Sequence, residues 1–234
     1  MSRIYFDGCA KTGGFAKAPV FHLRYSKLLC KKLGAEEYNI AQRCGNNKRI
    51  VRNLLEHDLS KFDLFVIQMT KRRRFEFYDS KTHRWISIGY DSGYLPRRVS
   101  GFSEQIKIDY VSRRDENNQV IKHTMWGDDI ITLNEKHELT VNNISDELRE
   151  FIKYTLFYFK NIYTEKQGKI DEQMCFSTIK STLKNHKHII IWMGEGDCDV
   201  PVDFKYKKGK KYKSGLYFGE KEHEMIYNDI LKLL

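Results

Sequence analysis

The sequence predicts an α/β protein: a three-layer α/β/α sandwich on a flavodoxin-like parallel sheet, with an insertion in the middle of the chain. Apolar runs of strand length at 3–6, 37–41 and 63–69 alternate with two helical patterns. This β-α-β-α-β order favours parallel strands joined by right-handed crossovers. A further apolar run at 188–194 and a closing helix extend the pattern to the end of the sequence.

Helical periodicity marks the segments between these runs. Residues 22–34, HLRYSKLLCKKLG, repeat leucines at helical spacing and end at Gly34, a usual helix stop. Because the carboxyl ends of parallel strands meet at one edge of a sheet, we expect function in the loops that follow the strands. Further helices are expected at 46–57, 145–165, 171–186 and 220–234.

The middle of the chain has a different pattern. Residues 74–79 and 83–90 alternate like hairpin strands, whereas 90–139 is polar and irregular. We therefore expect a single domain over residues 1–234, with an insertion or lid at about 75–140.

The chain is basic. Its 41 lysines and arginines exceed its 31 aspartates and glutamates, which gives a formal net charge of +10 and favours anionic partners. Neither a signal-peptide pattern nor a long apolar stretch is present, so we expect an intracellular, cytoplasmic protein without membrane contact. The cysteines are odd in number and lack zinc spacing, so we expect reduced thiols: Cys9, Cys30, Cys44, Cys175 and Cys198.

No cofactor or metal site is predicted. His186 and His188 alternate before a strand without an evident third ligand. The acidic cluster Asp197, Asp199 and Asp203 lacks EF-hand spacing, and the lysines that follow balance its charge.

Four blocks resemble one known family. DGCA at 7–10, NIAQRCGNN at 39–47, VIQMTKRRRFEF at 66–77 and GEKEHEMI at 219–226 are similar to blocks of the SGNH (GDSL-like) hydrolases, especially divergent small members common in viral genomes. The resemblance covers both ends of the chain and leaves the middle unexplained. It implies ester hydrolysis, such as removal of acyl groups from a glycan or another small ester, without a cofactor.

The resemblance also implies roles for particular residues. The family places its serine nucleophile where Ala10 stands, and the oxyanion hole then uses the residue-10 amide and Gly45, with Asn46 or Asn47 as the side-chain donor. Tyr217 stands where the family has its histidine, which favours natural divergence over a deliberate serine-to-alanine change. His223 is then the remaining candidate base, and Cys9 an alternative nucleophile. Other substrate-binding side chains expected at this edge are Asp7, Gln68, Thr70, Arg74 and Tyr217.

Each of these residues also has an ordinary structural interpretation. Cys9 fits a small buried hydrophobe, and His223 fits a solvated position on a terminal helix. As the sequence stands, the hydrolase is expected to be weak or inactive. The alternative is a noncatalytic protein that holds an anionic glycan or nucleic acid through Arg72–Arg74 and the lysine-rich segment Lys205–Lys213.

Overall fold

The chain divides into two compact units. The computed structural model describes residues 2–13, 23–42, 45–72, 74–79, 84–90, 96–100, 109–114, 120–126, 129–133, 139–141, 154, 157–158, 161–193, 198–206 and 220–234. The first unit combines Met1–Arg74 with Gly168–Leu234, and the second runs from Phe75 to Gln167.

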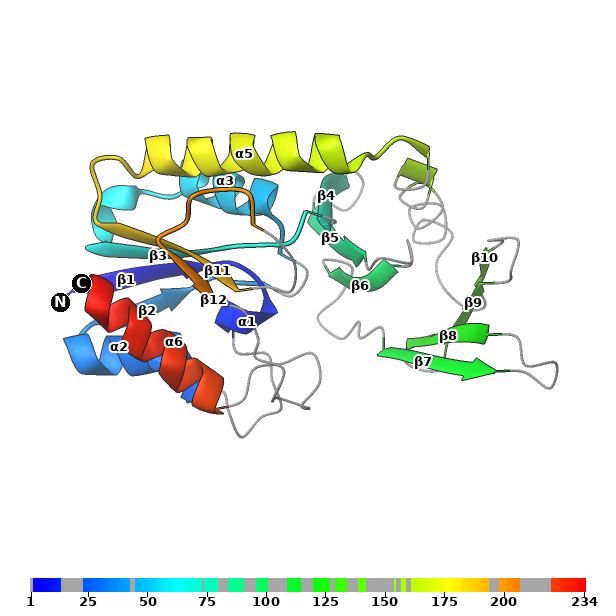
Figure 1. Cartoon of the computed structure of the whole chain (residues 1–234), viewed down its shortest axis with the longest axis horizontal. Coiled ribbons are helices and arrows are strands. Elements are labelled where there is room, and N and C mark those ends of the chain that lie inside the picture. Colours follow the sequence, from blue (N-terminus) through cyan, green and yellow to red (C-terminus); the bar gives the residue numbers. More distant parts are fainter. Residues whose placement is uncertain are drawn as a thin grey trace. The chain divides into compact units, whose positions relative to one another are not determined.

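The first unit contains a five-stranded sheet in the order β12-β11-β3-β1-β2 (Figure 1). Every pairing in it is parallel, and the order is compatible with a flavodoxin-like fold. The predicted α/β class with a parallel sheet is therefore confirmed. In such a sheet the chain reverses its direction of winding between β1 and β3, and ligands bind beyond the strand ends there. The strands are β1 (Arg3–Asp7), β2 (Glu36–Asn39), β3 (Leu64–Met69), β11 (His188–Met193) and β12 (Phe204–Tyr206).

Two hydrophobic clusters include alternate residues of the same strands. Ile4 and Phe6 of β1 pack with α2 and α6, whereas Tyr5, between them, packs with α3 and α5. Successive strand side chains point to opposite faces, so each cluster covers one face of the sheet. The helices are α1 (Ala10–Gly13), α2 (Tyr25–Leu33), α3 (Asn47–Glu56), α5 (Glu165–Thr182) and α6 (Glu220–Leu233), with a 3₁₀ turn at Leu59–Lys61.

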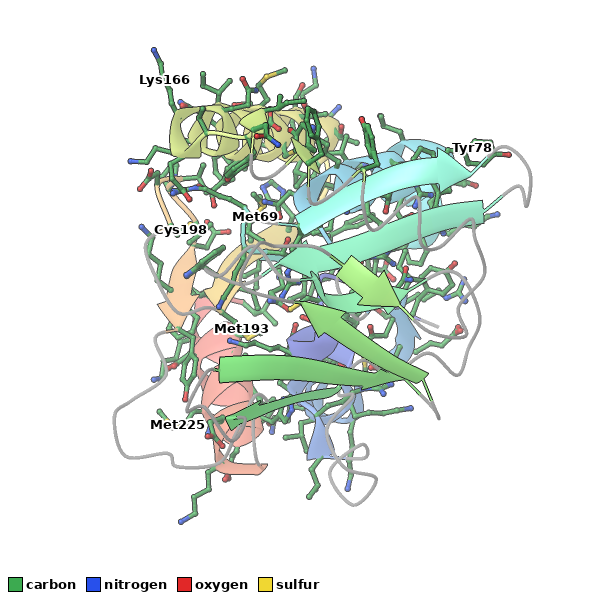
Figure 2. All side chains as sticks on the ribbon, turned by 90° about the vertical axis from the view of Figure 1, so that its right-hand side faces the viewer. Met69, Tyr78, Lys166, Met193, Cys198 and Met225 are labelled. Atoms are coloured by element: carbon green, nitrogen blue, oxygen red, sulfur yellow. The ribbon has the colours of Figure 1, made fainter. Side chains whose placement is uncertain are left out.

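The sequence located most of these elements. Gly34 caps α2 in the left-handed conformation, with φ of 62°, as the helix-stop pattern predicts. Helix α5 begins earlier than expected, at Glu165, and β12 lies in a segment expected to be a loop. Most of the helix expected at 145–165 lies outside the described residues. Figure 2 labels Met69 and Met193, the last residues of β3 and β11, which mark the carboxyl edge of the sheet (Figure 2).

The second unit is built on antiparallel pairing. β5 pairs with β6, and β7, β8, β9 and β10 pair in sequence order in another sheet. The strands after Tyr90 were missed because their segment shows no clear alternation. That this unit is an insertion or lid stays a prediction. The bounds are β4 (Arg74–Asp79), β5 (Arg84–Tyr90), β6 (Pro96–Ser100), β7 (Asp109–Arg114), β8 (Val120–Trp126), β9 (Asp129–Leu133) and β10 (Leu139–Val141).

None of the helices in the described part of the chain is long and apolar enough to cross a membrane.

Candidate functional site

Two glycines bring the β1–α1 turn against the start of α3. Gly8 has a φ of 155°, and a Cβ added there would lie 2.6 Å from the Gln68 Cβ. A Cβ on Gly45 would collide with the Gly8 carbonyl oxygen. Larger residues at these positions would push the turn, β3 and the α3 start apart, so the close approach of these segments depends on glycine.

Asp7, at the end of β1, is a fully buried anion with a complete set of donors. Its Oδ1 accepts hydrogen bonds from the Gly8 amide at 2.7 Å and from Arg49 Nη1 at 2.6 Å. Its Oδ2 accepts from Asn53 Nδ2 at 2.8 Å. A buried carboxylate needs such partners to remain charged. Asp7 therefore joins β1 to α3, and its oxygens already hold these donors instead of a substrate.

Gln68 of β3 is the centre of a second network. Its Oε1 accepts from Thr12 Oγ1 at 2.7 Å and from the Cys9 amide at 3.3 Å, and its Nε2 donates to Cys9 Sγ at 3.0 Å. Thr12 Oγ1 lies 2.8 Å from the Tyr25 hydroxyl. This network fixes the turn that carries Ala10, so Gln68 acts as a positioning side chain for the turn.

The Cys9 thiol is buried among hydrogen-bond donors. Burial by itself raises the pKa of this thiol, but the Arg74 guanidinium beside it, the Lys11 amide and the Gln68 carboxamide favour the thiolate, and the net pKa is lowered. Arg74 Nη1 also donates to the Gly45 carbonyl at 2.7 Å. Cys9 is thus buried, as the structural interpretation expects, yet its surroundings stabilise a charge.

The three candidate oxyanion-hole residues differ in whether their N–H donors already have protein partners. The Gly45 amide donates to the Gln42 carbonyl at 2.9 Å. Asn47 Oδ1 accepts from the Thr70 amide at 2.7 Å, and its Nδ2 donates to the Thr70 carbonyl at 3.1 Å. Asn46 Oδ1 caps α3 by accepting from the Arg49 amide at 2.9 Å, but the buried Asn46 Nδ2 has no partner among the described residues.

His223 is not the solvated side chain that one interpretation expects. It is 1% exposed, it stacks on Tyr25 at 6.1 Å between ring centroids, and its Nδ1 accepts from the Tyr25 amide at 3.3 Å. Burial and, to a smaller extent, the Arg24 charge lower its pKa to about 4. The expectation of solvation is wrong because Tyr25 of α2 covers this part of α6. No described contact joins His223 to Cys9 or Ala10.

The basic residues predicted to hold an anionic ligand are described only in part, and those that are described contact protein groups. The Arg72 guanidinium pairs with Glu172 at 2.9 Å and with Asp199 at 2.7 Å, so it balances protein carboxylates. Lys205 Nζ donates to the Cys198 carbonyl at 3.0 Å. Arg73, residues 207–213 and Tyr217 lie outside the described residues.

The acidic candidates have structural partners. Asp199 pairs with Arg72 and Lys169, and Asp203 Oδ2 accepts from the Ile190 amide at 2.7 Å. Asp197 lies outside the described residues. No cluster of metal-binding side chains occurs in the part of the chain that the structure describes.

Sequence reasoning missed four residues of the site. Thr12 and Tyr25 extend the Gln68 network, and Arg49 and Asn53 hold Asp7. The available signal was the spacing of Arg49 and Asn53, four residues apart, which puts two polar side chains on one face of α3. A buried carboxylate at the end of β1 is the partner that such a face requires.

Two comparisons with known proteins identify no relative of this chain. No protein-family model matches the chain, and a search of curated proteins finds no match. The likeness to SGNH hydrolases rests on the four sequence blocks.

Proposed function

We propose that the first unit is an SGNH-like three-layer α/β/α domain that binds a small acylated ligand, such as an acylated glycan, and has little or no esterase activity. The strand order and the helices associated with each of the two core clusters support the architecture. The position of the β1–α1 turn beside the end of β3 supports a site at this edge.

The contacts at the turn favour binding over hydrolysis. Alanine at position 10 supplies no nucleophilic oxygen. The Gly45 amide and both polar atoms of the Asn47 side chain already have protein partners, whereas an oxyanion hole needs donors aimed at the reacting oxygen. His223, neutral near pH 7, holds the Tyr25 amide instead of a nucleophile.

The unpaired Asn46 Nδ2 carries the binding proposal. Asn46 is 2% exposed, and a buried donor without a partner costs about 1–3 kcal/mol. A ligand carbonyl oxygen would satisfy it. Acyl esters, amides and carboxylates all provide such an oxygen, so the donor defines a chemical class of ligand.

The test is a titration followed by the side-chain amide signals of Asn46 in a nitrogen–proton NMR spectrum. N-acetylglucosamine is the neutral acylated probe and acetate the charged one. We expect saturable shifts of these signals, and loss of probe binding in Asn46→Ser. Serine retains a hydroxyl that caps α3, so the variant stays folded and isolates the donor. Parent protein that binds neither probe would overturn the proposal.

Hydrolysis of p-nitrophenyl acetate tests the second part of the proposal, that the domain has little or no esterase activity. The parent, Ala10→Ser and Ala10→Ser/His223→Ala are compared. We expect all three to remain near the buffer rate. A working general base contributes about 100-fold or more, so activity of that size in Ala10→Ser, lost in the double variant, would show a latent esterase and contradict the noncatalytic proposal.

A further inference from the structure

Within the part of the chain that the structure describes, Arg74 differs from the other arginines near the site in having no carboxylate partner. Arg24 pairs with Glu37 at 2.8 Å, Arg49 with Asp7 at 2.6 Å, and Arg72 with Glu172 at 2.9 Å. Arg74 is half-buried, and within the described residues its contacts are the Gly45 carbonyl and the Cys9 thiol. A guanidinium partly removed from water requires a counter-charge to be stable.

Cys9 supplies that counter-charge when it ionises. Gln68 Nε2 donates to the sulfur at 3.0 Å, and the Lys11 amide also donates to it. Other charged groups nearby have their own partners. Asp7 is paired with Arg49, and Lys11 Nζ donates to the Met193 carbonyl at 2.9 Å. Burial keeps the neighbouring Tyr25 phenol protonated by raising its pKa, and His223 is neutral.

Asn46 provides an independent indication of a ligand next to Gly45 in the chain. It directly follows Gly45, whose carbonyl holds Arg74, and its buried Nδ2 has no partner. In the described residues, a guanidinium without a carboxylate thus binds Gly45, and a carboxamide donor without an acceptor belongs to the adjacent residue, Asn46. An oxyanion satisfies both, because it supplies several acceptors and a negative charge.

We propose that this site takes a small oxyanion, held by Arg74 and Asn46, and that the anion and the Cys9 thiolate compete for the charge of Arg74. The inference rests on the proposed ligand site and adds the charge of the ligand and a control by Cys9. Coupling between the two is reciprocal. A bound anion favours the protonated thiol, and ionisation of Cys9 weakens anion binding.

The first measurement is the affinity of the full-length chain for acetate, sulfate and phosphate at constant ionic strength. It is made as a pH series that runs downward from the usual thiol pKa of about 8.5, because the pKa of Cys9 is lowered. For sulfate, whose charge is constant near neutral pH, we expect weaker binding at the higher pH in the parent and pH-independent binding in Cys9→Ser. A preference for acetate over the other two anions identifies a carboxylate ligand, whereas the reverse identifies a phosphate or sulfate group.

Variants separate the roles of the two donors. Arg74→Gln is expected to weaken anion binding about 10-fold or more, the range for a hydrogen bond to a charged group. Arg52→Gln is the matched control, because it removes the same charge from a residue that pairs with Glu56 on α3. Equal losses in both variants would point to general charge attraction and would overturn the inference.

Thiolate absorbance in the ultraviolet, taken as parent minus Cys9→Ser, gives a second readout that does not need access to the buried sulfur. Saturating anion is expected to shift this titration to higher pH, and Arg74→Gln is expected to abolish the shift. An unshifted titration with bound anion would overturn the competition. Binding of N-acetylglucosamine without any anion binding would overturn this inference alone, whereas no binding of either kind would overturn the proposed function as well.

Discussion

The polar contacts at the carboxyl edge of the parallel sheet differ between its two faces. On the α2 and α6 side, a chain of neutral groups runs from Gln68 through Thr12 to the Tyr25 hydroxyl. On the α3 side, the buried Asp7–Arg49 ion pair is the link between strand and helix. The α3 side also contains the unpaired Asn46 Nδ2. The first face thus fixes the turn, while the second combines fixed charges with an unused donor, and for this reason we place the proposed ligand site near α3.

The largest expected effect comes from breaking the ionic side. Asp7→Ala leaves the Arg49 guanidinium buried without its carboxylate, which typically costs about 3–5 kcal/mol of folding free energy. Urea unfolding measures the loss. Asp229→Ala, which removes a partner of the exposed Lys232, is the control and should change stability by less than about 1 kcal/mol. Similar small losses in both variants would show that the ion pair does not hold the α3 face.

The neutral side is expected to be the weaker of the two. Gln68→Ala deprives Thr12, the Cys9 amide and the Cys9 thiol of their common partner. We expect a loss of about 2–3 kcal/mol in urea unfolding, the range for buried groups left unsatisfied. Gln173→Ala, at an exposed position of α5, should stay within about 0.5 kcal/mol of the parent. A Gln68→Ala loss larger than that of Asp7→Ala would reverse the comparison.

The smallest expected effect is a pH dependence from His223. Its pKa is lowered by burial from 6.5 to about 4, so the unfolded chain takes up the proton first. The stability from the neutral imidazole is complete above about pH 6.5 and is lost as the pH falls toward 4. From about pH 7 to about pH 5 we expect a loss of roughly 2 kcal/mol.

His223→Gln tests this assignment, because its carboxamide retains an acceptor for the Tyr25 amide but does not titrate in this range. Thermal unfolding across the same pH interval should therefore be flatter in the variant than in the parent. An unchanged pH dependence would assign the titration to a group other than His223.

The comparison also shows why the site was harder to predict than the fold. Asn46 and Asn47 are neighbours of the same residue type, yet Asn47 binds both polar groups of the Thr70 backbone while Asn46 retains a free donor. Arg72 and Arg74 are only two residues apart, and only Arg72 pairs with carboxylates in the described part of the chain. From the sequence alone, the two members of each pair are predicted to have the same role.

The sequence by itself determined the parallel strands except β12, their order along the chain, the end of α2 at Gly34 and the edge where polar residues gather. These features depend on local periodicity and on glycine, which act within a few residues. Tertiary structure alone decided that the Gly45 amide is occupied, that Tyr25 covers His223, and that Arg74 reaches Cys9. Those outcomes depend on which distant segments meet, because a buried donor or charge takes whichever partner packing brings within reach.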